Sequence, residues 1–402
     1  MAAETSEVEV AVVGGGPAGL TVAIALAAAG VETALAAARP RRDNRTTALL
    51  LGSITALTTL GVWERCRDEA AAIAVMRLVD DTARLVRAPE VAFSAAEIGE
   101  AAFGYNIANR HLMAALEARA ATLPALARFE EAASSVTLGT REATIRLAGG
   151  GCIRARLVVG ADGRSSVCRA AAGIAVDRRT YAQTALTLNL GHRRPHANVC
   201  TELHTESGPF TLVPLPGNRS SLVWVTGREE ADDLVARADD ALAEAIERRS
   251  HSILGRIEVE PERGAFPLEV ATARACGGRR VVLVGEAAHV MPPIGAQGLN
   301  LGLRDAAAVG ELVVEARRTG ADPGDDALVA RYAAMRHTDV AARTLAVDLL
   351  NRSLLIDFLP VQGARGLALY LIDAIAPLRR AVMREGIAPA ASAPRLMRGE
   401  AL

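Results

Sequence analysis

The stretch Gly14-Gly15-Gly16-Pro17-Ala18-Gly19 decides the fold, because its glycines recur at the spacing GxGxxG. The short apolar run Val8–Val13 before it is typical of a buried parallel strand. Pro17–Ala29 is rich in Ala and Leu, begins with proline and is followed by Gly30, which predicts a helix. Glu32–Ala37 then predicts a second strand. The chain therefore opens with a strand–helix–strand unit.

Each glycine of this stretch has its own task in a dinucleotide-binding loop. Gly14 permits the tight turn, Gly16 lets the backbone approach a pyrophosphate, and Gly19 lets the helix pack close to the sheet. Pro17 and Ala18 begin the helix, whose positive N-terminus would face the phosphate charge. An ordinary glycine-rich turn is the alternative, and the flanking strand and helix argue against it.

One part of the fingerprint is missing. A dinucleotide-binding unit normally has an acidic residue about 20 residues further on, which binds a ribose. Ala36-Ala37-Ala38-Arg39 stands there in this chain, and Glu32 comes too early in the strand. Loss of one such hydrogen bond costs about 1 kcal/mol or a little more, so binding should weaken but persist.

Two further glycine motifs follow predicted strands. The second motif, Gly160-Ala161-Asp162-Gly163-Arg164-Ser165-Ser166-Val167-Cys168-Arg169, comes directly after the apolar run Leu157–Val159. The third motif, Gly285-Glu286-Ala287-Ala288-His289, follows Arg280–Val284, which has the pattern of a buried strand. The loop Pro292–Asn300 then leads into a helical pattern that runs from Leu299 to about Arg318.

The rest of the chain shows two other patterns. Gly173–Pro267 contains alternating Thr, Val and Leu between glycines and prolines, which indicates antiparallel strands, with Pro216-Gly217-Asn218 as a turn. Helical periodicity dominates from Asp325 onward, and we expect interruptions at Pro360 and Pro377.

Composition excludes several classes of protein. The 402 residues carry a net charge of −1 with mixed signs, which argues against a nucleic-acid partner. All 45 basic residues are arginine, so Schiff-base chemistry and a Walker lysine are excluded. The five cysteines show no CxxC spacing, and no signal peptide or membrane span is evident. These features predict a cytoplasmic protein without a zinc site.

The three motifs, in this order, resemble the p-hydroxybenzoate hydroxylase-like (group A) family of FAD-dependent monooxygenases. Several other stretches resemble the ubiquinone-biosynthesis hydroxylase branch of that family; among them are Arg45–Leu49, Gly104–Ile107, Tyr181-Ala182-Gln183 and Gln297–Asp305. The resemblance covers nearly the whole chain and becomes weaker in the C-terminal helices.

The resemblance implies an α/β fold with three parts. These are a discontinuous Rossmann-like FAD-binding domain, an inserted antiparallel-sheet substrate domain and a C-terminal helical region. The expected boundaries are 1–75 with 105–172 and 272–325, then 76–104 with 173–271, and finally 326–402.

The resemblance also implies roles for individual residues. The second motif is expected near FAD and the nicotinamide. Glu286, where the family usually has Asp, is expected to contact the ribitol. Arg45 is suited to neutralise a flavin phosphate. The implied cofactor-binding residues are Gly14, Gly16, Pro17, Ala18, Gly19, Arg45, Asn109, Asp162, Gly163, Glu286, Gly298, Leu299 and Asn300. Pro292, Pro293 and Gly295 are implied at the reacting centre, beside the isoalloxazine.

The implied reaction is hydroxylation of an aromatic ring, with a prenylated phenol of ubiquinone biosynthesis as the substrate. NAD(P)H would reduce FAD, and O₂ would react through a C4a-hydroperoxyflavin. The sequence shows no Ser/His/Asp set and no metal-ligand cluster, which suits an enzyme whose cofactor carries the chemistry. There is no second GxGxxG, so the nicotinamide would dock only transiently.

Two alternatives stay open, and a third is disfavoured. A flavin-dependent reductase of isoprenoids would use the same fold. A flavin-poor scaffold of a quinone-biosynthesis assembly is suggested by Ala37 and Glu286. A halogenase is disfavoured, because the chain lacks both a lysine and a Trp-x-Trp-x-Ile-Pro segment.

Several remaining residues have structural interpretations. Trp63 and Trp224 are expected in the core, and His196 and His289 are expected to be structural. Leucines at near-helical spacing in Val340–Leu378 indicate either ordinary core or a face for peripheral attachment to the inner side of a membrane. The sequence also leaves open a homo-oligomer or a quinone-biosynthesis complex.

Overall fold

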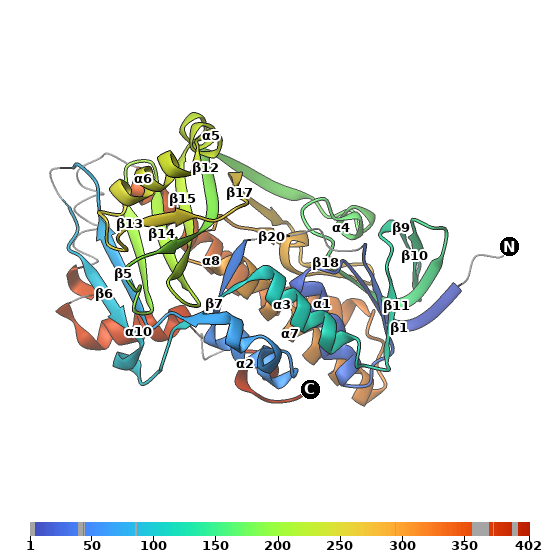
Figure 1. The fold of residues 1–402 in the computed structure, drawn as a ribbon. Coiled ribbons are helices and arrows are strands. Elements are labelled where there is room, and N and C mark those ends of the chain that lie inside the picture. The colour runs from blue at the N-terminus through green and yellow to red at the C-terminus, as the bar shows by residue number, and fades with distance from the viewer. Residues whose placement is uncertain are drawn as a thin grey trace.

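The structure is a computed structural model that describes residues 5–38, 43, 45–84, 87–293, 295–355, 370–372, 374–387 and 393–402. The described chain forms a mainly parallel sheet with its helices, a large antiparallel sheet, and long helices that run alongside both (Figure 1). This is the α/β architecture with an antiparallel sheet and C-terminal helices that the sequence predicts.

The first sheet has parallel strands at its centre. β1 (Thr5–Val13) pairs with β11 (Cys152–Gly160) on one side and with β2 (Thr33–Ala36) on the other. β8 (Leu126–Phe129) lies beyond β2, and β19 (Val281–Leu283) lies beyond β11. The antiparallel strands β9 (Ala133–Leu138), β10 (Ala143–Leu147) and β18 (Gly277–Gly278) complete it.

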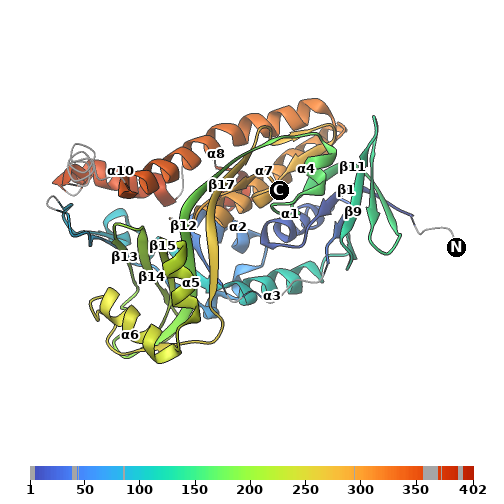
Figure 2. The same cartoon turned by 90° about the horizontal axis from the view of Figure 1, so that it is seen from above.

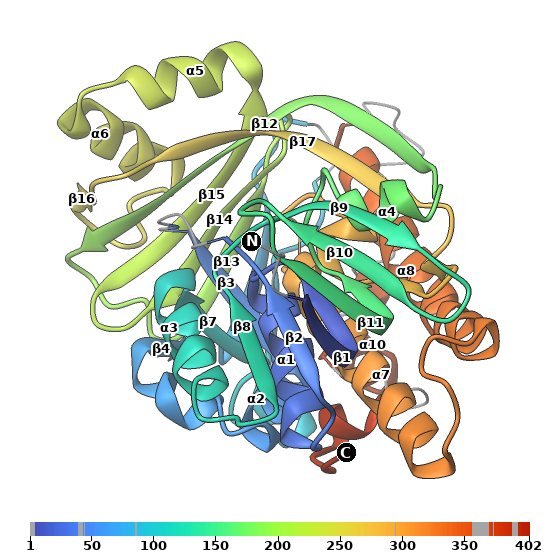
Figure 3. The same cartoon turned by 90° about the vertical axis from the view of Figure 1, so that its right-hand side faces the viewer.

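Both faces of this sheet are covered. Val10 and Val12 of β1 belong to a core that they share with the helices α1 (Pro17–Ala28), α3 (Asn109–Ala120) and α7 (Gln297–Thr319), seen in Figure 3. Ala11 and Val13 point the other way, toward β10 and α4 (Val167–Ala171). Burial on both faces explains why β1 reads as a continuous apolar run and not as an alternating one. The predicted strand–helix–strand opening is confirmed.

The second sheet follows the order β20-β17-β12-β15-β14-β13-β5-β6, with β16 beside β12. Its strands are antiparallel except for the pair β13 and β5. The long strands β12 and β17 extend from this sheet toward α4 (Figure 2). The bounds are β5 (Val75–Asp80), β6 (Val91–Ser94), β12 (Val176–His192), β13 (Val199–His204), β14 (Pro209–Leu215), β15 (Arg219–Gly227), β16 (Ile257–Val259), β17 (Gly264–Ala273) and β20 (His289–Val290).

The core of the second sheet is aromatic at its centre. The rings of Phe210 and Trp224 meet edge to face, with centroids 5.2 Å apart. The helices α5 (Arg228–Ala236) and α6 (Asp239–Arg249) contribute further apolar side chains to the same core. The prediction that Trp224 belongs to the core is confirmed, and Trp63 is likewise buried in the first core.

A small third sheet joins the two large ones. It consists of β3 (Thr46–Leu50), β7 (Gly104–Ala108) and β4 (Ala70–Ala72), and α2 (Leu51–Thr59) follows β3. Asn106 on β7 donates hydrogen bonds to the Pro214 carbonyl and to the Ser221 hydroxyl of the second sheet. The short 3₁₀ helices are η1 (Trp63–Arg65), η2 (Arg67–Glu69), η3 (Ala95–Ile98), η4 (Gly285–Ala287) and η6 (Arg395–Arg398).

The C-terminal part contains α8 (Asp326–Leu355) and α10 (Ala376–Ile387). The expected interruption near Pro377 is confirmed, because Ile375 is not helical and a new helix begins at Ala376. Pro377 is the second residue of α10, where a missing N–H costs nothing because that group has no partner within the helix. Pro360, Phe358, Leu367 and Leu369 lie outside the described residues, as do the side chains of Leu345, Leu349, Leu354 and Leu355.

A buried ion cluster fixes α7 to its neighbours. Asp305 of α7 accepts hydrogen bonds from the Gly285 N–H (2.9 Å), from His289 Nε2 (2.7 Å) and from Arg336 Nε of α8 (2.6 Å). Burial raises the pKa of the Asp305 carboxyl, but the interactions with His289 and Arg336 outweigh this effect and lower the pKa to about 2. The carboxylate therefore ties the third glycine motif to two helices.

We predict that Asp305→Asn lowers the free energy of unfolding by about 3 kcal/mol at neutral pH, because the buried Arg336 loses one of its two carboxylate partners and keeps only Asp339. A carboxyl with a depressed pKa stabilises the fold above its unfolded pKa, and this stabilisation disappears as the pH falls from about 4 to about 2. In chemical denaturation across this pH range, the free energy of unfolding should fall less on acidification in the variant than in the unchanged protein.

The control is Asp177→Asn, which breaks the exposed ion pair with Arg274. Its stability at neutral pH should stay close to that of the unchanged protein. Equal stabilities of the Asp305 variant and the unchanged protein at neutral pH would show that the cluster does not hold the fold.

Candidate cofactor site

The GxGxxG loop Gly14–Gly19 borders an open space beside Gly16, which is called the Gly16 cradle below. Gly14 has φ +111°, and a Cβ there would lie 2.2 Å from the Ala161 carbonyl oxygen. A Cβ on Gly19 would lie 2.0 Å from the Gly14 carbonyl oxygen. Gly16 differs, because a Cβ there would meet nothing within 4 Å. Gly14 and Gly19 are thus needed for the loop itself, whereas Gly16 borders open space.

The first N–H groups of α1 have no partners within the helix, and the helix begins beside that space. Gly16 is the N-cap of α1 and makes no side-chain capping bond, and Pro17 follows as the first helical residue. A Cβ on Gly302 of α7 would lie 3.2 Å from the Ala18 Cβ and 3.3 Å from the Gly285 Cα. The small residues Ala18, Gly285 and Gly302 therefore bring the starts of α1 and α7 close to the third motif, where helix N-termini favour an anion.

Arg45 is oriented by a chain of hydrogen bonds. Its Nε and Nη2 donate to the two carboxylate oxygens of Asp43, each at 2.8 Å. Asn109 Nδ2 also donates to Asp43 (2.8 Å), and Thr47 Oγ1 donates to Asn109 Oδ1 (2.6 Å). Burial raises the pKa of the Asp43 carboxyl, but the bonds from Arg45 and Asn109 give a net lowering. Arg45 also stacks over the Phe266 ring at 5.4 Å.

This arrangement joins two residues that the sequence singles out, Arg45 and Asn109, through one that it does not. Asp43 was missed, although an acid two residues before a candidate phosphate-binding arginine is a usable signal. The two oxygens of Asp43 hold the Arg45 guanidinium in one orientation. The guanidinium stays charged, since the bond to Asp43 raises the pKa of Arg45.

The second motif folds around Asp162. This carboxylate accepts bonds from Ser166 Oγ (2.6 Å), the Val167 N–H (2.7 Å) and the Cys168 N–H (3.2 Å), so it caps the first turn of α4. Gly163 has φ +77°, and a Cβ there would meet nothing within 4 Å. The structure therefore uses the Asp162 side chain to hold the loop, while Gly163 leaves the backbone open.

The second and third motifs are linked by arginines. Arg164 donates to both oxygens of Glu286 (3.3 and 3.2 Å) and to Glu269 (3.0 Å). The buried Arg169 donates to the carbonyls of Ala287 (2.8 Å) and Arg164 (2.7 Å). Glu286, the expected ribitol ligand, is thus exposed and held by Arg164. The sequence patterns indicate no separate role for either arginine.

The loop before α7 is anchored by Asn300. Its Oδ1 accepts from the Leu50 N–H (2.9 Å) and from Ser53 Oγ (2.7 Å), and its Nδ2 donates to the carbonyls of Ala48 (2.9 Å) and Ala296 (2.6 Å). The amide is therefore fully used within the protein. Its side chain ties the loop to β3 and α2.

The rest of this loop is open. Pro292 is buried, whereas Pro293, Gly295 and Gly298 are exposed, and Leu299 packs partly against the first core. Gly295 has φ +65°, and a Cβ on Gly298 would meet nothing within 4 Å. The described loop therefore presents bare backbone beside the N-terminus of α7.

The two histidines that the sequence singles out make structural bonds. His289 is buried and holds Asp305, and His196 Nε2 is 3.0 Å from the Leu215 carbonyl oxygen. Neither bond involves the open space beside the glycine loops.

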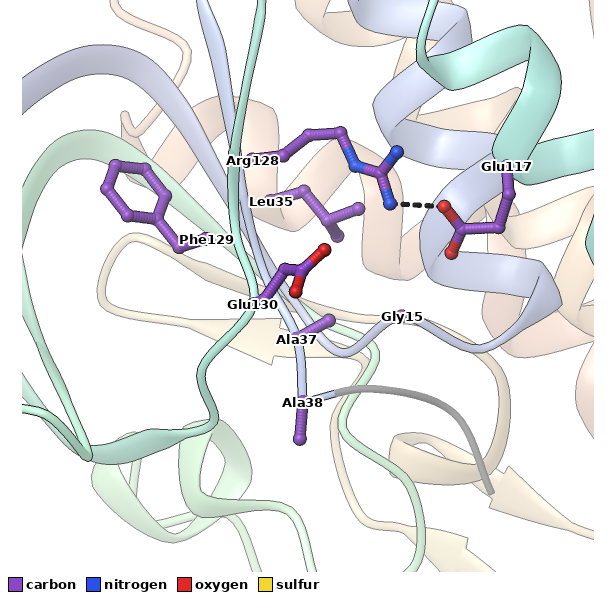
Figure 4. A pocket seen from close by; sticks show the side chains of 8 residues that line it. All are labelled: Gly15, Leu35, Ala37, Ala38, Glu117, Arg128, Phe129 and Glu130. Atoms are coloured by element: carbon purple, nitrogen blue, oxygen red, sulfur yellow. Dashed lines mark hydrogen bonds and ion pairs between the residues drawn. The ribbon is translucent and has the colours of Figure 1, made fainter. Parts of the chain in front are cut away.

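Beside the end of β2 lies a pocket of about 340 Å³, shown in Figure 4. Its lining residues are Gly15, Leu35, Ala37, Ala38, Glu117, Arg128, Phe129 and Glu130. Together with the Gly16 cradle and the uncapped start of α1, it suits a long ligand with a pyrophosphate at its centre and a nucleoside at one end. FAD fits this description.

Comparison with known proteins gives a consistent result. Residues 7–346 match the family model described as an FAD binding domain. The chain is 37% identical to the ubiquinone hydroxylase UbiL of Rhodospirillum rubrum, with 97% of this chain and 92% of that protein aligned. It is 30% identical to the 3-demethoxyubiquinol 3-hydroxylase of Escherichia coli over 94% and 97% of the two chains.

Among solved structures, p-nitrophenol 4-monooxygenase PnpA from Pseudomonas putida superposes with a TM-score of 0.78 at 18% identity, covering 95% of this chain and 98% of that one. At this identity the likeness concerns the fold.

We predict that Gly16→Val and Gly298→Val abolish cofactor binding while leaving the fold intact. Both sites border open space, so the new side chain fills room outside the protein core. Thermal unfolding without cofactor should stay within a few degrees of the unchanged protein, and flavin titration should show no binding. Gly19→Val is the contrast, because its side chain would collide with the Gly14 carbonyl and should unfold the loop. Tight flavin binding by both open-site variants would contradict the assignment.

Proposed function

Because this chain belongs to the ubiquinone hydroxylase family of FAD-dependent aromatic monooxygenases, we propose that it hydroxylates the ring of a polyprenylated phenol in ubiquinone biosynthesis. The observation that carries the proposal is the extent of the similarity. It runs through the whole chain, so it includes the second sheet as well as the cofactor-binding motifs.

FAD is the cofactor of this family, and NAD(P)H is its typical reductant; when bound and reduced, FAD would activate O₂, of which one atom enters the ring and the other leaves as water. The chain's own residues would bind the cofactor and orient it. In this proposal the Gly16 cradle and the start of α1 hold the pyrophosphate, and Arg45, fixed by Asp43, adds positive charge.

The loop before α7 is proposed to face the reacting ring system. Pro292, Pro293 and Gly295 shape its surface, and Gly298 with Leu299 places backbone N–H groups at the helix N-terminus. A helix N-terminus stabilises negative charge that develops nearby. The second sheet, with its apolar core, is proposed to enclose the phenol and to exclude water.

The test is a product assay with the purified protein, NAD(P)H and a prenylated phenol under heavy-isotope oxygen. We expect substrate-dependent O₂ uptake and a product that carries one labelled oxygen on the ring, identified by mass spectrometry. Reduction of an isoprenoid double bond without O₂ uptake would favour the reductase instead. A protein that purifies without yellow flavin and cannot be reconstituted with FAD would favour the scaffold.

A polyprenylated substrate also needs an apolar route, and we propose that α10 provides peripheral contact with an anionic membrane. One face of α10 is anchored, because Arg379 pairs with Glu97 and Met383 is buried beside Phe103. Leu378 and Val382, one turn apart, are exposed. Exposed apolar side chains beside arginines are typical of helices that lie on anionic lipid. Within the described residues, no helix is long and apolar enough to cross a bilayer.

We predict that the double change Leu378→Ser and Val382→Ser abolishes sedimentation with anionic liposomes, while the unchanged protein sediments. Phe266→Ser is the control for sedimentation alone, because Phe266 is as exposed (41%) as Leu378 (41%) but lies on β17, where it contacts Arg45 of the proposed cofactor site. The double variant should lose turnover of long-chain phenols and keep that of short-chain phenols. If the unchanged protein does not sediment, α10 is not a membrane contact.

A further inference from the structure

The pocket at the end of β2 lies where the sequence lacks its expected ribose-binding acid. The strand ends at Ala36, Ala37 follows it, and a Cβ on Gly15 would lie 2.6 Å from the Ala37 Cβ. The glycine loop therefore passes directly over Ala37. A dinucleotide whose pyrophosphate lies at Gly16 extends its adenosine half across this point.

The neighbouring strand brings a carboxylate to the same place. β8 pairs in parallel with β2, with Phe129 opposite Ala36, and the Ala37 N–H donates to the Phe129 carbonyl at 3.0 Å. Glu130, the first residue after β8, thus leaves the sheet beside Ala37. Adjacent strands lie about 4.8 Å apart, a gap that a Glu side chain can cross.

The side chains confirm this placement. In Figure 4 the Glu130 carboxylate lies beside Leu35 and Ala37, on the side of the strand that faces Gly15. The pocket has a second carboxylate, Glu117, which lies on α3 and pairs with Arg128 across the upper rim, away from the end of β2. Of the two acids that line the pocket, Glu130 is the one that stands at the strand end.

We propose that Glu130 replaces the missing acid of β2 and accepts hydrogen bonds from the ribose hydroxyls of the adenosine half of FAD. A carboxylate has two oxygens and accepts from two adjacent hydroxyls, as the usual acid at the end of the second strand does. Ala37 leaves the room that the ribose occupies. The inference depends on FAD binding and not on the identity of the phenol.

The first measurement is the FAD dissociation constant of the apoprotein, obtained by titration of flavin fluorescence. Glu130→Gln should weaken binding by about tenfold or more, the size expected for hydrogen bonds to a charged acceptor. The matched control is Glu131→Gln, the same change one residue later. Glu131 bonds to the Gly149 N–H at 2.6 Å and does not line the pocket, so this variant should bind FAD normally.

The second measurement uses an FAD analogue that lacks the 2′-hydroxyl of the adenosine ribose. The unchanged protein should bind the analogue about tenfold more weakly than FAD, and Glu130→Gln should bind both nearly equally, because the partner group is already lost. The comparison of FAD with the analogue on the unchanged protein does not depend on whether any variant folds. Returning the acid to β2 in the double variant Glu130→Gln, Ala37→Glu should restore FAD affinity.

Two results would overturn the proposal. One is an unchanged protein that binds FAD and the analogue with the same affinity. The other is a Glu130→Gln variant that folds normally and binds FAD as tightly as the unchanged protein does. Both readouts are equilibrium binding, so they are independent of whether the chain hydroxylates any phenol.

Discussion

The close approach of backbone to backbone at the carboxyl ends of β1 and β11 is the constraint on which the rest of the structure depends. Gly14 lies against the Ala161 carbonyl, and Gly19 lies against Gly14, with no room for a side chain at either position. This contact brings the start of α1 to the second glycine motif. A second close approach involves the small residues Ala18, Gly285 and Gly302, and it brings α7 against α1 and the third motif. Two helix N-termini therefore meet beside three strand ends, and such a meeting point favours an anionic ligand.

Arginine, carboxylate and amide side chains hold the backbone of the glycine loops in place. Asp305 binds the backbone of the third motif and Arg336 of α8 in a fully buried cluster. Arg169 holds the second motif to the third, and both amide atoms of Asn300 form hydrogen bonds that anchor the loop before α7. These side chains position the backbone of the glycine loops, and the N-termini of α1 and α7 lie beside them. Such a site suits an enzyme whose cofactor performs the chemistry.

The division of labour between the sheets follows from their burial patterns. The parallel strands are apolar on both faces and are enclosed, so their ends are the accessible part. The antiparallel sheet has its own aromatic core around Phe210 and Trp224 and is joined to the first sheet through β3 and β7. The fold alone does not fix a reaction, and the assignment of substrate class rests on similarity along the whole chain.

The sequence by itself determined the βαβ opening, the antiparallel insertion and the start of α7 near Leu299, because these depend on local periodicity and on glycine spacing. It also pointed to Arg45, Glu286 and the three motifs. Only the tertiary structure decided that Asp162 caps α4, that Asp43 orients Arg45 and that Glu130 stands beside Ala37. The physical reason is distance along the chain: Glu130 and Ala37 become neighbours through the pairing of two parallel strands, and no local pattern records which strands pair.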